Sequence, residues 1–473
     1  MAQIAIIGGA GYVGLTYAVA FTELGHEVVA LDIDPTKVST LLAGRSPIYA
    51  PGLDELLQRG LASGCLRFTT EYADAVPGAD FAFLCVGTPT AADGGADMTY
   101  VRAAARSVAE HATGHVIVVN KSTVPVGSAT LVAHILAEHA APGATFAVVS
   151  NPEFVAEGVA IQDIFNPDRI VVGSDDPVVG LRVAALYAAL NAPVVVTDPA
   201  SAEMIKYASN AFLATKISFI NEVAAICERL GADVTEVARG VGLDGRIGQR
   251  FLRAGAGFGG SCFPKDVRAL GTMARHAGVE PRVLDAVLAV NASARDQVVA
   301  KVIELLGGVR GKTIAILGLA FKPDTDDVRD APALDIIRRL VAAGARVKAT
   351  DPVAMPHVAR LLPEAELAAD AYAAAADADA IVLVTEWAGY RGLDLARLAA
   401  AMRGRLVVDG RNALSPTAVA AAGLIYVGVG RATPAAAAAP TLPVAFTVSG
   451  LAQVDMVALA LGDDASFVSS GSD

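Results

Sequence analysis

Short apolar runs alternate with amphipathic segments through about the first 200 residues of the chain. Seven runs have the length and the apolar or β-branched composition of buried strands: residues 4–8, 27–32, 81–86, 116–120, 146–150, 169–173 and 193–197. The segments between them, such as residues 13–24, 101–111 and 128–139, carry apolar side chains at helical spacing. This alternation predicts a parallel β-sheet flanked by helices.

The pattern changes at Ser201. Residues 201–230 contain neither proline nor glycine and are apolar at helical spacing, which predicts one long helix. Helical segments continue to about Glu304, with a glycine-rich interruption at residues 255–260. Beyond them the alternation returns, with strands predicted at residues 313–317, 346–350, 380–385 and 405–408 and a helix at residues 333–343.

The pattern therefore predicts an α/β protein with two Rossmann-like, doubly wound parallel-sheet domains, joined by a central helical domain that contains one long helix. We place the first α/β domain at residues 1–198, the helical domain at residues 199–305 and the second α/β domain at residues 306–430. Residues 431–473 begin with a stretch rich in alanine and proline, and we expect them to form a disordered tail.

Composition limits the classes of partner. Apolar residues make up 54% of the 473 residues, and 37 basic against 49 acidic side chains give a net charge of −12. Because an acidic surface repels phosphate backbones, we expect no nucleic-acid partner. We find neither a secretory signal nor an apolar run of about 18 residues, so we expect no membrane span. The four cysteines are widely spaced and fit neither a disulfide framework nor a zinc site, which favours a cytoplasmic protein without a bound metal.

A glycine-rich turn follows the first predicted strand. Gly9-Ala10-Gly11-Tyr12-Val13-Gly14 opens a helix, so its backbone can approach a pyrophosphate and the helix N-terminus can supply N–H donors. Asp32 ends the second strand, where a carboxylate can bind the ribose hydroxyls of a dinucleotide. Because no arginine follows Asp32 directly, NAD is favoured over NADP. The alternative is a glycine-rich turn that binds no ligand.

Two further loops follow predicted strands and contain Thr88 and Thr123, in Gly87-Thr88-Pro89 and Ser122-Thr123-Val124-Pro125. Ligands of open α/β sheets lie beyond the carboxyl ends of the strands, so both loops are placed to contact the nicotinamide side of the cofactor. Taken alone, each is equally well explained as a simple turn.

Residues 151–157, Asn-Pro-Glu-Phe-Val-Ala-Glu, have the composition of a helix start, with Asn151 as the cap and Pro152 in the first turn. On such a helix Glu153 and Glu157 share a face and can handle protons or order a water molecule. The alternative is that the two carboxylates only complement the helix dipole.

Lys206 and Asn210 are one helical turn apart on the predicted long helix, among apolar neighbours. A lysine that is partly buried near a cofactor can stabilise an alkoxide or act as a base. The alternative is a lysine that extends to solvent beside an exposed asparagine.

The most specific segment is residues 257–266, Gly-Phe-Gly-Gly-Ser-Cys-Phe-Pro-Lys-Asp. The glycines allow an unusual backbone beside a ligand, and Pro264 is predicted to be the first residue of a helix, which places Cys262 just before the helix N-terminus. The helix N-terminus and the nearby Lys265 both favour a thiolate at Cys262, and Asp266 can take protons or orient water. The alternative is an inert thiol, which we expect for the other three cysteines.

These segments together resemble the UDP-glucose/GDP-mannose dehydrogenase family over about residues 1–430. The resemblance rests on the glycine-rich turn at residues 9–14, residues 151–158, Lys206 with Asn210, residues 257–266, residues 318–323 (Gly-Leu-Ala-Phe-Lys-Pro) and residues 409–412 (Asp-Gly-Arg-Asn). One position departs from the family: Ala50 stands where glutamate is usual, and we expect it to remove a local hydrogen bond without affecting the chemistry.

The resemblance implies roles for individual residues. Cys262 is implied as the nucleophile, with Lys206, Asn210 and Asp266 stabilising an alkoxide and handling its proton. Thr123 and Glu157 are implied to order water, and Glu153 belongs to the same site. The residues implied to bind the cofactor are Gly9, Gly11, Tyr12, Val13, Gly14, Asp32, Lys37, Thr88, Thr123 and Lys265. Those implied to bind the substrate are Phe154, Glu157, Lys206, Asn210, Arg246, Phe251, Phe258, Gly259, Lys322 and Arg411.

The resemblance also implies a homodimer or larger assembly that forms through the helical domain, with Arg246 reaching the substrate of a neighbouring subunit. It implies oxidation of the primary alcohol of a nucleotide-sugar to a carboxylate, with two NADH formed and Cys262 carrying a thiohemiacetal and then a thioester. The segments around Cys262 are most similar to the branch that acts on UDP-glucose. GDP-mannose and UDP-N-acetylhexosamines stay open as substrates.

Two other functions compete with this one. A simple 3-hydroxyacid dehydrogenase also combines a Rossmann domain with a Lys-x-x-x-Asn pair, but it forms one NADH and needs no cysteine. A non-catalytic sensor of nucleotide-sugars would need none of the catalytic residues. The segment at residues 257–266 and the third domain favour the four-electron dehydrogenase. In that third domain Gly318-Leu319-Ala320 lacks the repeated glycines of a dinucleotide site, so we expect a nucleotide-sugar to bind there, across a cleft from NAD.

Overall fold

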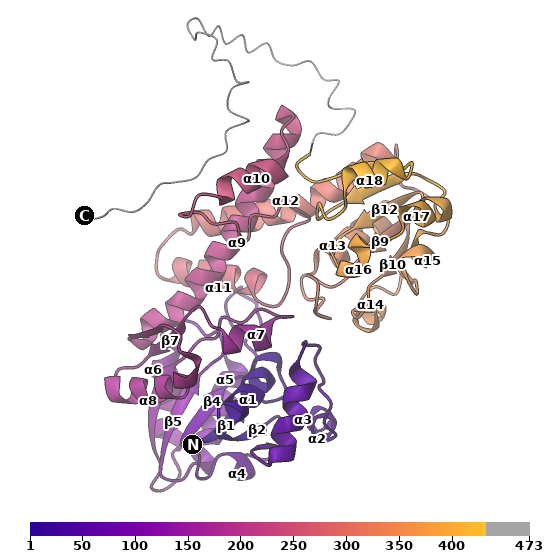
Figure 1. Ribbon diagram of the computed structural model, residues 1–473. Helices are drawn as coiled ribbons and strands as arrows, with labels where there is room; N and C mark the ends of the chain where they lie inside the picture. Colours follow the sequence, from indigo (N-terminus) through magenta and orange to yellow (C-terminus); the bar gives the residue numbers. More distant parts are fainter. Residues whose placement is uncertain (432–473) are drawn as a thin grey trace, which may run out of the picture.

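The structure is a computed structural model that describes residues 1–431. Two α/β domains lie at opposite ends of the molecule, and a helical region connects them (Figure 1). This arrangement confirms the predicted fold class, whereas the domain boundaries given above stay predictions. The predicted tail lies, apart from Arg431, outside the described residues.

The first domain contains an eight-stranded sheet with the order β3-β2-β1-β4-β5-β6-β7-β8. Its strands are β1 (Gln3–Ile7), β2 (Glu27–Leu31), β3 (Leu66–Thr69), β4 (Phe81–Leu84), β5 (His115–Asn120), β6 (Thr145–Ser150), β7 (Ile170–Gly173) and β8 (Val194–Thr197). All neighbouring strands are parallel except β6 and β7, which meet in an antiparallel contact at Ser150 and Gly173. Strand β3 was not predicted, because at this sheet edge the exposed Arg67 interrupts the apolar run.

Helices cover both faces of this sheet, because successive side chains of each strand point to opposite sides. Ile4 and Ile6 pack on the side of α1, while Ala5 and Ile7 pack on the side of α5 and α6. The helices are α1 (Tyr12–Glu23), α2 (Pro35–Leu42), α3 (Leu53–Ser63), α4 (Tyr72–Ala75), α5 (Thr99–His111), α6 (Ser128–His139), α7 (Ala160–Phe165) and α8 (Pro177–Ala185), followed by a 3₁₀ turn (Ala188–Leu190).

The central region is built on helix α9 (Pro199–Leu230), which confirms the predicted long helix. The Asp198 side chain caps its start by accepting a hydrogen bond from the Ser201 N–H at 2.8 Å, and Gly231 ends it in the left-handed conformation. The remaining helices are α10 (Val234–Gly242), α11 (Phe263–His276) and α12 (Arg282–Leu305). Both α11 and α12 pack against α9.

The third domain contains a six-stranded parallel sheet with the order β11-β10-β9-β12-β13-β14. Its strands are β9 (Thr313–Leu317), β10 (Arg346–Thr350), β11 (Glu366–Leu367), β12 (Ala380–Leu383), β13 (Leu406–Asp409) and β14 (Ile425–Val427). Its helices are α13 (Pro332–Ala342), α14 (Met355–Leu361), α15 (Ala371–Ala375), α16 (Ala388–Arg391), α17 (Leu395–Ala401) and α18 (Pro416–Ala421).

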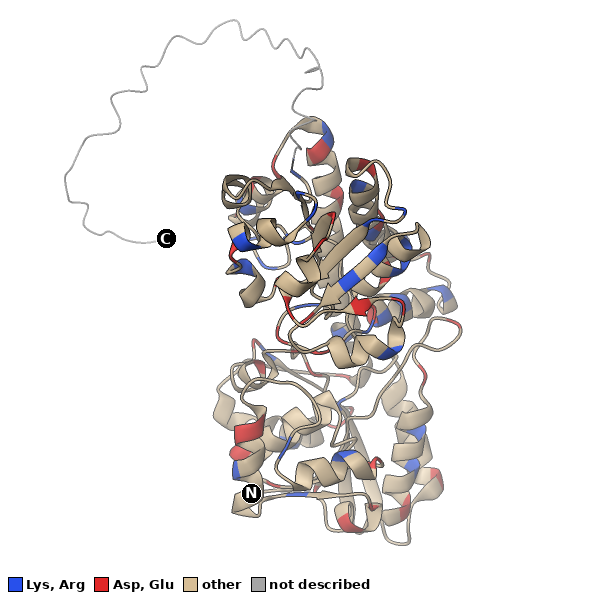
Figure 2. Cartoon of the chain, turned by 90° about the vertical axis from the view of Figure 1, so that its right-hand side faces the viewer, with Lys and Arg blue, Asp and Glu red and all other residues tan. Residues whose placement is uncertain are grey.

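The surface carries both signs of charge. Figure 2 shows lysine and arginine interspersed with aspartate and glutamate along the chain in both α/β domains. Among the described residues, no helix combines the length and the apolar composition that crossing a membrane requires.

Candidate active site

The candidate residues converge between the two α/β domains from four parts of the chain: the segment after β6, helix α9, the loop before α11 and the segment after β9. A cleft of about 330 Å³ opens here. It is lined by Glu157, Gly158 and Val159 of the first domain, by Arg253 of the central region, and by Lys322, Pro323, Asp324, Glu386, Ala388 and Arg391 of the third domain.

The segment after β6 does not form the helix that we predicted. Residues 151–157 are irregular, and helix α7 begins only at Ala160. Asn151 does not cap a helix, because its side chain accepts hydrogen bonds from Lys121 at 3.1 Å and Tyr187 at 2.5 Å and donates to the Val171 carbonyl at 2.7 Å. Glu153 and Glu157 therefore do not share a helix face, and each binds a different group.

Glu153 forms a buried ion pair with Lys206. The ammonium nitrogen lies 2.8 Å from the carboxylate, and the two side chains are only 4% and 6% exposed, so the solvent-exposed lysine that we considered is excluded. Burial alone would raise the pKa of Glu153, but the Lys206 charge and hydrogen bonds lower it overall. Burial alone would lower the pKa of Lys206, but Glu153, Cys262 and Asp266 raise it overall. Both groups are therefore charged.

One turn further along α9, Asn210 donates to the Asp266 carboxylate at 2.6 Å. The other oxygen of Asp266 accepts from Lys265 at 2.5 Å. The structure thus brings Lys206, Asn210 and Asp266 to one place, as the resemblance implies. Lys265, which we expected to act on the Cys262 sulfur, is directed instead to its neighbour Asp266.

Cys262 occupies the N-cap position of α11, which begins at Phe263, one residue before the predicted Pro264, and its side chain makes no capping hydrogen bond. The electrostatics around the thiol also differ from the prediction. Burial raises the pKa of the Cys262 thiol, and the nearby Glu153 and Asp266 carboxylates raise it further. Lys206 acts in the opposite direction without offsetting them. The predicted lowering of the Cys262 pKa is therefore wrong, because spacing along the chain does not show that two carboxylates lie near this half-buried residue.

The glycines before Cys262 are required by close packing on the third domain. Gly260 has a φ of +86°, and a Cβ atom there would lie 2.7 Å from the Phe321 ring. A Cβ atom on Gly259 would lie 2.4 Å from the Asp330 carbonyl oxygen. The loop that carries the thiol is therefore fixed directly against the third domain.

The glycine-rich turn fits a dinucleotide. A Cβ atom on Gly14 would lie 2.1 Å from the Gly8 carbonyl oxygen, so only glycine permits this close turn. No side chain caps α1, which leaves its first N–H groups free for an anion such as a pyrophosphate. Asp32 is held at the end of β2 by the Ala10 N–H at 3.0 Å and the Asp34 N–H at 3.1 Å.

The other residues implied to bind the cofactor are distributed around this turn. Tyr12 accepts a hydrogen bond from the Gly158 N–H at 3.0 Å, and Val13 is half-buried in the first turn of α1. Thr88 donates to the Thr123 carbonyl at 2.9 Å, which joins the two loops that follow β4 and β5. Lys37 is exposed on α2. Gly9 faces β2 and Gly11 precedes α1.

Of the two predicted substrate-binding residues of the third domain, Lys322 lines the cleft, whereas Arg411 does not. Burial lowers the pKa of the Lys322 ammonium group. Arg411 donates to the Val384 carbonyl at 2.7 Å and to the Gly257 carbonyl at 3.0 Å, so it attaches the glycine-rich loop to the third domain.

Three aromatic residues surround the thiol loop and the ion pair. The Phe154 ring lies 3.6 Å from the Arg169 guanidinium and 5.4 Å from the Lys206 nitrogen. The Phe258 and Phe251 rings both contact Phe263, with centroid distances of 6.0 Å and 6.1 Å. Arg246 lies outside this group, because 89% of its side chain is exposed and it pairs with Asp244 at 2.6 Å.

Several residues of the site were missed in the sequence. Arg253 lies two residues after Phe251 and adds a cation to the cleft, as does Arg391. Ser261 contacts both Cys262 and Glu157. Lys121 is buried behind the loop of Thr123, and burial lowers its pKa to about 7. Lys121 could have been found in the sequence, because it is a charged residue directly before a predicted site loop. The position of Arg391 at the cleft depends on the tertiary fold.

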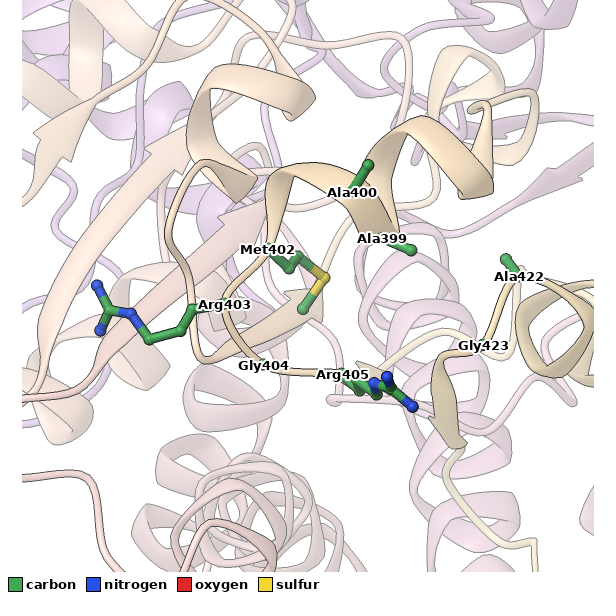
Figure 3. A pocket seen from close by; sticks show the side chains of 8 residues that line it. All are labelled: Ala399, Ala400, Met402, Arg403, Gly404, Arg405, Ala422 and Gly423. Carbon is green, nitrogen blue, oxygen red and sulfur yellow. The ribbon is translucent and has the colours of Figure 1, made fainter.

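A second cavity, of about 390 Å³, lies elsewhere on the third domain (Figure 3). It is lined by Ala399, Ala400, Met402, Arg403, Gly404, Arg405, Ala422 and Gly423. Gly404 and Arg405 precede β13, so this cavity lies at the amino ends of the strands, opposite the ligand-binding edge of open α/β sheets. It shares no residue with the site described above.

Known proteins are similar to this chain over most of its described residues. Residues 2–191, 200–293 and 315–416 match the NAD binding, central and UDP binding domains of the UDP-glucose/GDP-mannose dehydrogenase family. The UDP-glucose 6-dehydrogenase TuaD of Bacillus subtilis is 48% identical over 432 residues, which is 91% of this chain and 94% of that protein. The match to the NAD binding domain confirms the predicted cofactor, NAD.

Two solved structures extend the comparison. The UDP-glucose dehydrogenase of the hyperthermophilic archaeon Pyrobaculum islandicum has a TM-score of 0.86 at 44% identity and covers 91% of this chain and 98% of that one. A UDP-D-ManNAc dehydrogenase of Pyrococcus horikoshii has a TM-score of 0.81 at 26% identity and covers 90% and 99%. The fold is thus shared by relatives named for different sugars.

Proposed function

Because the chain belongs to the UDP-glucose/GDP-mannose dehydrogenase family, we propose that it oxidises UDP-glucose to UDP-glucuronate through a covalent intermediate on Cys262. The four-electron oxidation forms two NADH for each sugar. Residues 9–14 and Asp32 would hold NAD, which would supply a hydride acceptor for each oxidation step. The chain's own residues bind the sugar nucleotide, move the protons and hold the aldehyde.

The surroundings of Cys262 support this proposal most directly. The thiol lies at the start of α11, next to the Lys206–Glu153 ion pair and the hydrogen-bonded Asn210–Asp266 pair. A simple 3-hydroxyacid dehydrogenase needs a lysine and an asparagine but has no use for a thiol at this position. A sensor that only binds nucleotide-sugars needs neither ion pair nor thiol.

In the first oxidation, the sugar C6 hydroxyl loses its proton and its carbon is oxidised to an aldehyde. Lys206 and Asn210 stabilise the alkoxide with a positive charge and an N–H donor in a site that is shielded from water. Asp266, whose carboxylate contacts Asn210, accepts the proton. The product aldehyde remains next to Cys262.

In the second half, the Cys262 sulfur adds to the aldehyde carbon to give a thiohemiacetal, and its oxidation leaves a thioester. Water then adds to the thioester carbon, the carbon–sulfur bond breaks and the carboxylate leaves. Asp266, Thr123 and Glu157 order this water. Covalent capture explains why the reactive aldehyde does not escape between the two oxidations.

The substrate is proposed to be UDP-glucose because relatives with 44% and 48% identity carry this sugar nucleotide in their names, whereas the relative named for UDP-D-ManNAc is 26% identical. Arg253, Lys322 and Arg391 give the cleft cations for a diphosphate. The test is the NADH yield from UDP-glucose, GDP-mannose and UDP-N-acetylhexosamines. Two NADH per UDP-glucose are expected, and a yield of one with free aldehyde would refute the proposal.

A homodimer or larger assembly is also proposed, formed through α9. Apolar side chains are exposed along this helix at intervals of about one or two turns: Met204, Phe212, Phe219, Ile226 and Leu230. Such a stripe on a surface helix is typical of a protein interface.

A reducing, cytoplasmic location is proposed because all four cysteines are free thiols and Cys262 must stay reduced to react.

A further inference from the structure

The Cys262 thiol must lose a proton before its sulfur can attack an aldehyde, and burial beside two carboxylates favours the protonated form. Among the described residues, the Cys262 sulfur has a side-chain hydrogen-bond contact only with Ser261, and neither Glu153 nor Asp266 contacts it in this way. Lys206 is protonated in its ion pair with Glu153 at 2.8 Å. The second oxygen of Glu153 accepts the Val155 N–H at 2.8 Å, and both oxygens of Asp266 accept hydrogen bonds from Asn210 and Lys265.

A different route leads away from the sulfur. The Ser261 hydroxyl oxygen lies 3.5 Å from the Cys262 sulfur and donates a hydrogen bond to the Glu157 carboxylate at 3.0 Å. A hydroxyl group can accept one hydrogen bond while it donates another. The thiol, the hydroxyl and the carboxylate therefore form a continuous hydrogen-bonded path from the first to the last.

We propose that Ser261 relays the thiol proton of Cys262 to Glu157. The S–H bond breaks as the proton binds to the Ser261 oxygen, and the original hydroxyl proton passes to the carboxylate. The products are a thiolate, an unchanged serine and a neutral Glu157, so the net charge of the buried site is the same before and after. The proton returns to sulfur when the thioester is hydrolysed. This inference rests on the proposed function of Cys262 as a nucleophile.

Glu157 is suited to receive a proton. Burial and the nearby Asp327 raise the pKa of Glu157, which reduces the penalty for its neutral form. Its second oxygen accepts a hydrogen bond from Thr325 at 2.9 Å, which a neutral carboxyl group can also do. Arg329, at 3.6 Å from Glu157, retains a closer partner in Asp327 at 2.7 Å, so protonation of Glu157 leaves no unpaired cation.

The relay connects the nucleophile to the third domain. Thr325 and Arg329 follow β9, whereas Glu157 belongs to the first domain, and the Ser261 loop packs on Phe321. The carboxylate thus has its full set of partners only when the three domains are in contact.

The relay predicts a pH dependence of the thiol's reactivity that changes when either Ser261 or Glu157 is replaced. The form with thiol and carboxylate and the form with thiolate and neutral Glu157 hold the same number of protons, so their ratio does not depend on pH. Alkylation of Cys262 by iodoacetamide, without substrate, should therefore reach a plateau that is independent of pH above the titration of Glu157, for as long as the thiolate with neutral Glu157 outnumbers the thiolate with ionised Glu157. Peptide mass spectrometry reports Cys262 separately, with Cys65 as the internal reference in the same sample.

Glu157→Gln should abolish the plateau, so that the alkylation rate rises about tenfold per pH unit until the thiol titrates. Ser261→Ala should lower the plateau by about tenfold, as expected for the loss of one hydrogen bond to a charged sulfur, and Ser261→Thr should restore it. A wild-type plateau in either Glu157→Gln or Ser261→Ala would overturn the relay. Because this assay needs no sugar nucleotide, its outcome is independent of the NADH yield that tests the proposed function.

Discussion

The ammonium group of Lys206 lies 2.8 Å from the carboxylate of Glu153 in a place where neither side chain reaches solvent appreciably. The two residues come from α9 and from the irregular segment after β6, so this pair joins the helical region to the first domain. A buried ion pair adds little stability over an apolar pair, but breaking it leaves an uncompensated charge. The contact is therefore better explained by chemistry at the neighbouring Cys262 than by stability.

This leads to a prediction about stability and activity together. Lys206→Met should lower the free energy of unfolding by about 3–5 kcal/mol, because it leaves the Glu153 charge buried and unpaired. The double variant Lys206→Met/Glu153→Gln should recover most of that loss, yet neither variant should form NADH from UDP-glucose. Urea unfolding and NADH absorbance measure the two effects. An active double variant would show that the lysine charge is not needed for the reaction.

Cys262→Ser should separate the two oxidations. The alkoxide-stabilising residues remain, so the first oxidation is retained, but no sulfur is available to hold the aldehyde. We expect at most one NADH per UDP-glucose, release of free aldehyde and an unchanged affinity for NAD by calorimetry. Cys227→Ser, at a buried position away from the site, is the control and should keep a yield of two. Normal formation of UDP-glucuronate by Cys262→Ser would remove the thiol from the mechanism.

The arrangement of elements could be read from the sequence wherever a segment is buried on all sides. Strands β1, β4 and β5 are continuous apolar runs, and α9 lacks any helix-breaking residue over its predicted length. Three of the four edge strands, β3, β11 and β14, were not predicted, because a strand that is buried on one face or spans two residues has no distinct apolar run. The fourth, β8, was predicted although it is largely exposed, because all four of its residues are β-branched. Whether a segment forms an edge strand depends on its packing against neighbouring strands more than on its own composition.

The site could be predicted as a set of residues but not as a set of contacts. Lys206, Asn210, Cys262 and Asp266 were recognised from their motifs, and the structure brings them together. The helix expected at residues 151–157 does not form. The Asn151 side chain, which was expected to cap it, instead accepts hydrogen bonds from Lys121, which follows β5, and from Tyr187, which follows α8. The direction in which the pKa of Cys262 shifts also depends on burial in the tertiary fold, which spacing along the chain does not determine.

Gly14→Ala should impair NAD binding. The added Cβ atom would lie 2.1 Å from the Gly8 carbonyl oxygen, so the turn must open and the N-terminus of α1 must move away from the pyrophosphate. We expect roughly tenfold weaker binding or more, the loss of one or two hydrogen bonds to a charged ligand. Calorimetric titration with NAD measures this. Gly240→Ala, where a Cβ atom meets nothing within 4 Å, is the matched control and should bind NAD normally.

Lys121 should make stability depend on pH. Burial lowers the pKa of Lys121 to about 7, below the value of about 10.4 for an unfolded lysine. The folded state therefore binds fewer protons between these values, so this residue's contribution to stability rises with pH above 7 and is lost as pH falls through 7. The stability of the wild type relative to Lys121→Met should increase by up to about 1.4 kcal/mol per pH unit between about pH 7 and 9.

Urea unfolding of the NAD-free protein at three pH values measures this slope. Lys37→Met, at an exposed position, is the control and should leave the slope of the wild type unchanged. A difference between wild type and Lys121→Met that is the same at every pH would mean that Lys121 is charged in the folded protein, held by Tyr17, whose ring centroid lies 4.0 Å from its nitrogen.

Arg246 provides the sharpest test of the assembly, because 89% of its side chain is exposed and it lies outside the site of its own chain. If it completes the site of a second subunit, neither Arg246→Ala nor Cys262→Ser should form UDP-glucuronate alone. In a mixed dimer, one site then combines an intact Cys262 with an intact Arg246, so random mixing should restore about a quarter of wild-type activity. Adding Phe219→Asp to both chains should prevent association and this recovery. Mixed dimers that form, as shown by mass, but remain inactive would place Arg246 outside the reaction.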